Sequence, residues 1–210
     1  MLVFVILKWI MRRILRKHKV IGIENVVEGT GAVFVCNHAG SYGPIAIELF
    51  FPFRYRPWVI YHTMTKKLCR LRLEKDLFGG AAKFLKPLCQ LLALAIEPIC
   101  LWVMRRIEAI PVYSGRNDIF KTFNISIEAL ESGCNIVLFL ETKKEFKTGF
   151  VHLARKYYEI TGKILCFYPV YSDRKTRTIT IGKPVDYLPG ANFKEEETRI
   201  AKKIMEAICI

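Results

Sequence analysis

The sequence predicts an α/β fold, a single-domain sandwich in which helices flank a largely parallel sheet. Short runs rich in β-branched and aromatic residues recur along the chain, and helical patterns lie between most of them. Several of these runs are apolar throughout. This pattern is typical of strands in a parallel sheet, because helices cover both faces of such a sheet. No repeat or linker divides the 210 residues, so one domain is the simplest arrangement.

The expected strands share a core of β-branched or aromatic residues and lie at 32–36, 57–61, 107–112, 135–140, 164–170 and 177–181. Helices are expected at 117–132, 149–160 and 192–208. The first two end close to a glycine, and the third has acids in its first turn and lysines later, as a helix dipole favours. In such sheets, ligands bind beyond the carboxyl ends of the strands.

Residues 1–19 predict an amphipathic helix that precedes an α/β domain at 20–210. Its uncharged run is too short to span a bilayer, which favours an interfacial helix with its cations on anionic headgroups. An amphipathic helix packed on the domain is the alternative. The apolar stripe holds Val3, Leu7, Ile10 and Ile14, and the basic stripe holds Lys8, Arg12, Arg16 and Lys19.

A second apolar run covers residues 88–104, with basic residues on both sides and Glu97-Pro98 in its middle. Proline removes a backbone donor, and a carboxylate in lipid is costly. We therefore expect a kinked helix, half buried in protein and half at the membrane, with a core helix as the alternative.

The chain combines a net charge of +14 with 52% apolar residues. Such a charge attracts anions, and the apolarity favours anionic membrane lipids over nucleic acid, for which no module is recognisable. We expect a peripheral or monotopic membrane protein on the cytoplasmic face.

The seven cysteines are scattered along the chain, which predicts that their thiols are reduced. Neither the cysteines nor the four histidines have the spacing of metal ligands.

Four segments in order carry a family resemblance. They are "NHAGS", with Asn37, His38 and Ser41, "IPVYSGR", which ends at Arg116, "FLETKK", with Glu141, Lys143 and Lys144, and "CFYPV". Together they resemble the motifs of the glycerolipid acyltransferase family that includes the 1-acylglycerol-3-phosphate O-acyltransferases. The resemblance covers about residues 20–187 and implies acyl transfer from a coenzyme A or acyl carrier protein thioester to a glycerol-phosphate or lysophospholipid hydroxyl, with no other cofactor.

The resemblance also implies roles for single residues. His38 would be the general base that removes the hydroxyl proton, with Glu141 orienting the site. The remaining site residues would bind substrate, with the three cations on the acceptor's phosphate. These are Asn37, Ser41, Arg116, Lys143 and Lys144.

The largest departure from the family is Gly43, which stands where an aspartate follows the histidine by five positions. We expect Glu141 to supply the missing carboxylate, and Gly43→Asp to restore activity to a Glu141→Gln variant. Glu48 is expected to point away from the histidine. If nothing replaces the aspartate, the protein binds lipid or an acyl carrier without turnover.

One other mechanism and one other function remain open. Cys36 lies two residues before His38, so a cysteine nucleophile is an alternative mechanism, although its apolar surroundings favour a core position. The alternative function is nucleic-acid binding by a basic protein, and such binding would weaken steeply with salt.

Overall fold

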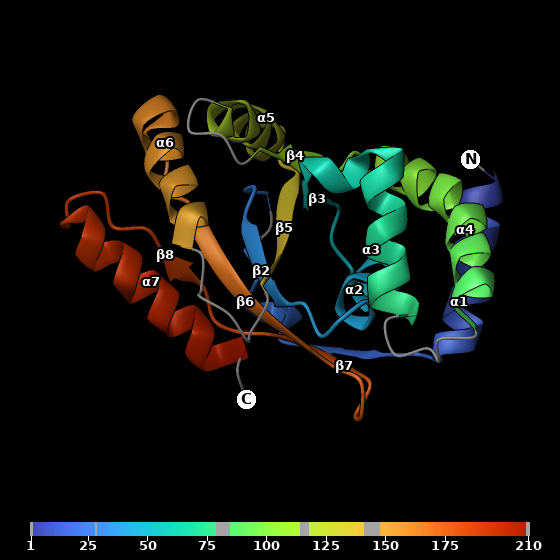
Figure 1. The fold of residues 1–210 in the computed structure, drawn as a ribbon. Helices are drawn as coiled ribbons and strands as arrows, with labels where there is room; N and C mark the ends of the chain where they lie inside the picture. The colour runs from blue at the N-terminus through green and yellow to red at the C-terminus, as the bar shows by residue number, and fades with distance from the viewer. Residues whose placement is uncertain (1, 28, 79–84, 114–117, 141–147, 209–210) are drawn as a thin grey trace. The chain divides into compact units, whose positions relative to one another are not determined.

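The computed structural model describes residues 2–27, 29–78, 85–113, 118–140 and 148–208 (Figure 1). The chain forms two compact units. One consists of residues 1–55 and 123–210, and the other of residues 56–122. The boundary predicted at residue 19 stays a prediction.

The larger unit contains a mostly parallel sheet in the strand order β1-β7-β6-β2-β5, with β8 paired to β6. The central strand β2 runs parallel to β5 and β6, β1 runs parallel to β7, and β6 is antiparallel to β7 and β8. This arrangement confirms the predicted α/β class. The strands are β1 Lys19–Ile21, β2 Val33–Asn37, β5 Asn135–Leu140, β6 Cys166–Asp173, β7 Thr178–Ile181 and β8 Val185–Asp186.

The helices of this unit are α1 Leu2–Leu15, α2 Tyr42–Phe50, α5 Ile119–Glu131, whose first residues belong to the other unit, α6 Val151–Thr161 and α7 Phe193–Ile208. Helix α7 packs on β6 and β8, and α1 packs on α2. The buried residues of α7 include Ile200, Ile204 and Ile208, whose spacing of four places them on one face.

The smaller unit contains β3 Tyr55–Ile60, whose first residue belongs to the larger unit, α3 Lys66–Phe78, α4 Lys86–Arg106 and β4 Ile110–Val112. Strands β3 and β4 are parallel, with Trp58 opposite Ile110. Helices α3 and α4 pack against each other. Three short 3-10 helices complete the described elements, at Ile23–Asn25, Tyr61–Met64 and Thr148–Phe150.

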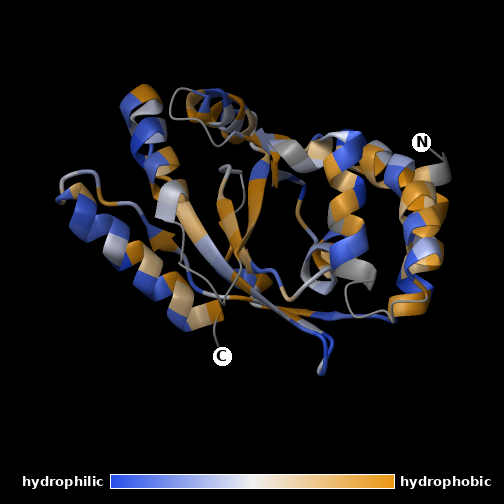
Figure 2. Ribbon diagram, viewed as in Figure 1, coloured by the Kyte–Doolittle hydropathy of each residue, from blue (hydrophilic) through white to orange (hydrophobic). Residues whose placement is uncertain are grey.

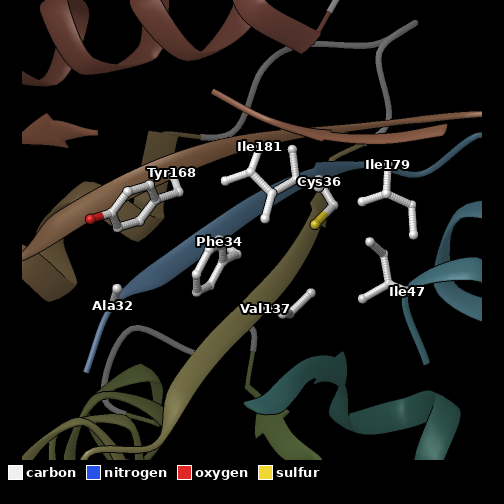
Figure 3. Close-up of a cluster of buried hydrophobic side chains, with 9 residues drawn as sticks. Ala32, Phe34, Cys36, Ile47, Val137, Tyr168, Ile179 and Ile181 are labelled. Carbon is white, nitrogen blue, oxygen red and sulfur yellow. The ribbon is translucent and has the colours of Figure 1, made fainter. Parts of the chain in front are cut away.

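The core of the larger unit lies around β2, whose five residues are all buried (Figure 3). Phe34 stacks on Tyr168 at 5.2 Å between ring centres and on Phe53 at 5.7 Å. Cys36 is fully buried in the same cluster, next to Ile47 of α2. The core position expected for Cys36 is confirmed.

The six predicted strands are all present, and the run 135–140 has its predicted bounds. The other five are shifted by up to three residues, as in the run 107–112, where α4 continues to Arg106 and β4 begins at Ile110. The predicted helix 1–19 ends at Leu15, and Lys19 is not on its basic stripe as expected, because β1 pairs with β7 there. The strands β1 and β8, which are too short to show alternation, and the helix α3 were not predicted.

Candidate active site

His38 is half-buried and lies directly after β2, at the carboxyl edge of the parallel sheet. Its backbone N–H donates to the carbonyl of Leu140, the last residue of β5, at 3.0 Å. Its ring meets the Phe139 ring edge-on at 6.0 Å. Among the described residues, no side chain hydrogen-bonds the imidazole. The ring therefore sits at the edge where this class of sheet binds ligands.

Asn37 ends β2 and has a buried side chain whose amide is engaged with Ser172 of β6. The Asn37 Nδ2 donates to the Ser172 carbonyl at 3.1 Å, and the Oδ1 accepts from the Ser172 backbone N–H at 2.8 Å and from its hydroxyl at 3.1 Å. The amide thus extends the pairing of β2 with β6 by one step beyond the backbone ladder. This contact fixes the strand end from which His38 emerges, and a role of Asn37 in substrate binding stays a prediction.

The chain after His38 turns through two left-handed residues, Ala39 at φ 42° and Gly40 at φ 65°. Glycine adopts this region freely, whereas alanine does so at a cost of about 1 kcal/mol. Ser41 follows in the N-cap position of α2, and its side chain makes no capping bond. The turn is therefore strained at the residue next to the candidate base, as backbone often is at functional sites.

Gly43 of α2 lies close to the backbone at the end of β2. A Cβ at this position would lie 2.5 Å from the His38 carbonyl oxygen and 2.6 Å from that of Asn37. Both contacts are with backbone atoms, which cannot swing aside as a flexible side chain does. A side chain at this position would therefore require α2 to move from the turn, and the restoration of activity by Gly43→Asp in a Glu141→Gln variant stays a prediction.

A buried histidine that the sequence reading missed holds the start of α2. His18 is 5% exposed and stacks on Phe50 at 4.3 Å between ring centres. Its Nδ1–H donates to the carbonyl of Arg16 at 3.1 Å, and its Nε2 is hydrogen-bonded to the hydroxyl of Tyr42. The same hydroxyl lies 3.3 Å from the carbonyl of Asp173 at the end of β6. Burial raises the pKa of Tyr42, so this hydroxyl keeps its proton at neutral pH.

The carboxylate of Glu48 has partners other than His38, and its expected direction away from the histidine stays a prediction. It pairs with Lys8 of α1 at 2.6 Å and accepts a hydrogen bond from the hydroxyl of Tyr55 at 2.7 Å. Burial and this carboxylate raise the pKa of Tyr55. Glu48 therefore joins α1 to α2 and does not serve the candidate base.

The geometry disfavours a cysteine nucleophile. Burial raises the pKa of the Cys36 thiol, so the reactive thiolate is not formed at neutral pH. Among the described residues, no group of histidine, cysteine or acidic side chains is arranged to hold a metal ion. His38 therefore stays the candidate for proton transfer at this edge.

Four of the predicted site residues lie outside the described residues. These are Arg116, Glu141, Lys143 and Lys144. Their roles stay predictions.

Neither a protein-family model nor a curated protein matches the sequence. The structure matches the crystal structure of the 1-acyl-sn-glycerophosphate acyltransferase PlsC from Thermotoga maritima with a TM-score of 0.56. The match covers 95% of this chain and 75% of the other, at 16% sequence identity. The chain shares an acyltransferase fold. The predicted resemblance to this family is thus confirmed at the level of the fold.

Within this acyltransferase fold, the Asn37 contact yields a stability prediction. Asn37→Ala leaves the buried N–H and carbonyl of Ser172 without their partner, and each unpaired group costs about 1–3 kcal/mol. We expect the free energy of unfolding, measured by urea titration, to fall by about 2–4 kcal/mol. Ser172→Ala removes only the hydroxyl bond and should cost about 1 kcal/mol. Equal losses in the two variants would contradict the bridging role of Asn37.

The pair of His18 and Tyr42 predicts a coupled response. Tyr42→Phe leaves the buried Nε2 of His18 without a partner and should lower the free energy of unfolding by about 1–2 kcal/mol. His18→Phe keeps a ring against Phe50. Because the double variant removes both partners, it should be about 1 kcal/mol more stable than the sum of the single losses predicts. Additive losses in this double-mutant cycle would show that the bond contributes nothing.

Proposed function

We propose that this protein is a membrane-associated O-acyltransferase. It transfers an acyl group from a coenzyme A or acyl carrier protein thioester to the hydroxyl of a glycerol-phosphate or lysophospholipid. The observation that supports this most is the placement of His38 after the central strand of an acyltransferase fold, at the edge of the sheet. A thioester is already activated, so the main task of the protein is to deprotonate an alcohol.

In the proposed reaction, the His38 imidazole accepts the acceptor's hydroxyl proton as the oxygen attacks the thioester carbonyl carbon. The resulting tetrahedral intermediate collapses, the carbon–sulfur bond breaks, and the imidazolium returns the proton to the leaving thiolate. No acyl-enzyme is formed. The half-buried position of the ring leaves one side for the acceptor.

Glu141 is proposed to orient the imidazole. The residue before it, Leu140, pairs with Asn37 and accepts the hydrogen bond of the His38 backbone. Since β2 and β5 are parallel, the residues that follow them leave the sheet at the same edge. The tight approach at Gly43 supports this assignment, because a carboxylate does not fit there without moving α2.

Arg116, Lys143 and Lys144 are proposed to hold the phosphate of the acceptor. Arginine can grip a phosphate through two parallel N–H bonds, and lysine contributes a mobile point charge. The support for this assignment is the order of the four motif segments in the sequence.

Membrane association is proposed to involve α4. By length and composition this helix can cross a bilayer. Of its most apolar stretch of 18 residues, only 17% is buried inside the protein. Its single acid, Glu97, is buried, and the helix continues through Pro98. Figure 2 shows apolar residues along much of α4. Such an exposed apolar surface favours a helix that lies in the membrane interface over a core helix. Exposed apolar residues of α4 include Leu88, Leu91, Leu92, Leu94, Ile99 and Trp102.

Helix α1 is proposed as a second membrane contact. Ile10 and Ile14 are exposed, whereas Leu7 is half-buried and Lys8 pairs with Glu48. The helix thus uses one side to pack on α2 and leaves another side apolar and open. It combines the packed and interfacial alternatives that the sequence left open.

A lipid-binding protein without turnover is the second candidate function, and the absence of a carboxylate at Gly43 favours it. The fold, the apolar helices and the basic charge fit a lipid-binding protein as well as an acyltransferase. Consumption of the thioester distinguishes the two functions.

The proposed base predicts loss of turnover on its removal. His38→Ala and Glu141→Gln should each lower thiol release from acyl-CoA or acyl carrier protein, in the presence of lysophospholipid or glycerol 3-phosphate, by about 10²-fold or more. His152→Ala is the matched control, because His152 is exposed on α6. Turnover by His38→Ala would contradict the general-base role. Absence of turnover in the wild type with every donor would favour the lipid-binding function.

The two apolar helices predict separable losses of membrane binding. Ile10→Gln/Ile14→Gln on α1 and Leu91→Gln/Ile99→Gln on α4 should each lower liposome sedimentation at least about tenfold, because burying an aliphatic side chain contributes about 1.5 kcal/mol or more. Ile160→Gln/Ile164→Gln removes two similarly exposed isoleucines elsewhere and serves as the control. If the α1 variant sediments with liposomes as the wild type does, the interfacial role proposed for that helix is wrong.

A further inference from the structure

A basic groove of about 660 Å³ lies on the larger unit, between the last turns of α1 and the end of α2. Among the described residues, its lining contains four arginine or lysine side chains, one buried histidine, three apolar residues and no acid. The lining residues are Trp9, Arg12, Arg13, Arg16, Lys17, His18, Leu49 and Phe50. His38 is not among them, so the groove is distinct from the candidate base.

The protein itself holds two of these cations in place. The Arg12 Nε donates to the carbonyl of Leu49 at 2.7 Å, which caps an end carbonyl of α2. The Arg13 guanidinium lies over the ring of Trp9, 5.2 Å from its centre. A guanidinium held by one contact loses less conformational freedom when it binds a ligand. The groove is therefore partly preorganised.

The cations of the groove have no acidic partner among the residues that the structure describes. Arg13, Arg16 and Lys17 are exposed, and neither they nor Arg12 form an ion pair with any residue that the structure describes. Lys8, one turn earlier on α1, is paired with Glu48. Neighbouring like charges repel each other, so a bound anion stabilises this arrangement.

Arg16 occupies a left-handed backbone conformation, with φ 58°. Glycine or asparagine adopts this conformation at lower cost at the end of a helix, whereas arginine loses about 1 kcal/mol. In this turn the Arg16 carbonyl accepts a hydrogen bond from the Nδ1 of His18, and the Arg16 side chain lines the groove. A charged residue at a strained position is a reason to look for a function of its side chain.

The ligand is indicated by what adjoins the groove. The successive residues of α1 are 100° apart around its axis, so Ile10 and Ile14 form a sector beside that of Trp9 and Arg13. Both isoleucines are exposed. A ligand with an anionic head and an apolar body fits this pairing of surfaces better than a wholly polar anion does.

We propose that the groove binds the phosphate headgroup of an anionic phospholipid, with a phosphomonoester preferred. A phosphomonoester carries more negative charge than a phosphodiester, and arginine binds its oxygens in bidentate fashion. The site is additional to the catalytic one. It does not depend on acyl transfer, because its binding needs no thioester and no turnover.

The test compares full-length proteins on two kinds of vesicle, phosphatidylcholine with phosphatidic acid and phosphatidylcholine with phosphatidylglycerol, matched in surface potential. The variant is Arg13→Gln/Arg16→Asn, in which asparagine keeps the left-handed turn favourable. Lys163→Gln/Lys183→Gln removes the same charge from exposed sites elsewhere and serves as the control. Arg12 is left intact because it caps α2.

We expect the Arg13/Arg16 variant to bind phosphatidic acid vesicles about 25-fold more weakly, as the product of two roughly fivefold losses. Its loss on phosphatidylglycerol vesicles should be smaller, and the control should keep the wild-type preference. Equal losses on both vesicles, or in the control, would reduce the groove to diffuse surface charge.

Two further outcomes would overturn the assignment. If the Arg13/Arg16 variant binds inorganic phosphate in solution more weakly than the wild type but keeps the wild-type affinity for phosphatidic acid vesicles, the groove takes a free anion instead of a headgroup. If a duplex or single-stranded oligonucleotide releases the wild type from phosphatidic acid vesicles and the variant binds it less, the partner is nucleic acid.

Discussion

The geometry of the candidate active site depends on how β2 ends. Parallel strands place the residues that follow them at one edge, but the edge is useful only if the last residue is fixed. The side chain of Asn37 does this by hydrogen-bonding Ser172 on one neighbouring strand while the His38 backbone bonds Leu140 on the other. A strand end held from both sides gives the next side chain a defined origin, which proton transfer over a distance of about 3 Å requires.

The turn after His38 carries the cost of this arrangement. Ala39 is left-handed, and Gly43 has no room for a Cβ because α2 begins against the carbonyl oxygens of Asn37 and His38. When the sequence is compared with the family motif position by position, Gly43 counts only as the loss of a carboxylate. In the structure it is a close approach of two backbones, and the replacement of one residue type by another changes the path of the chain as well as its charge.

The sequence predicted the parallel sheet and the place of His38 because both follow from apolar runs and the residues that end them. It could not show the hydrogen bonds between Asn37 and Ser172, since an amide that completes a sheet and one that binds substrate look alike in sequence. One signal was available, because a polar residue that continues a run of five buried positions is itself expected to be buried. His18 was missed because its partners Tyr42 and Phe50 lie far along the chain. The end of α1 was set too late because Arg16 gives no glycine or asparagine stop signal.

The pairing of the first strand with the last third of the chain has a consequence for biosynthesis. Asn25, which follows β1, donates to the carbonyl of Ile181, 156 positions later. At about 5–20 residues per second, the ribosome needs roughly 8–30 s to make that partner. During this interval the amphipathic first helix has emerged without the sheet that its downstream strand joins. The order in which the chain leaves the ribosome therefore gives its N-terminal segment an early opportunity to meet a lipid surface, before the domain closes behind it.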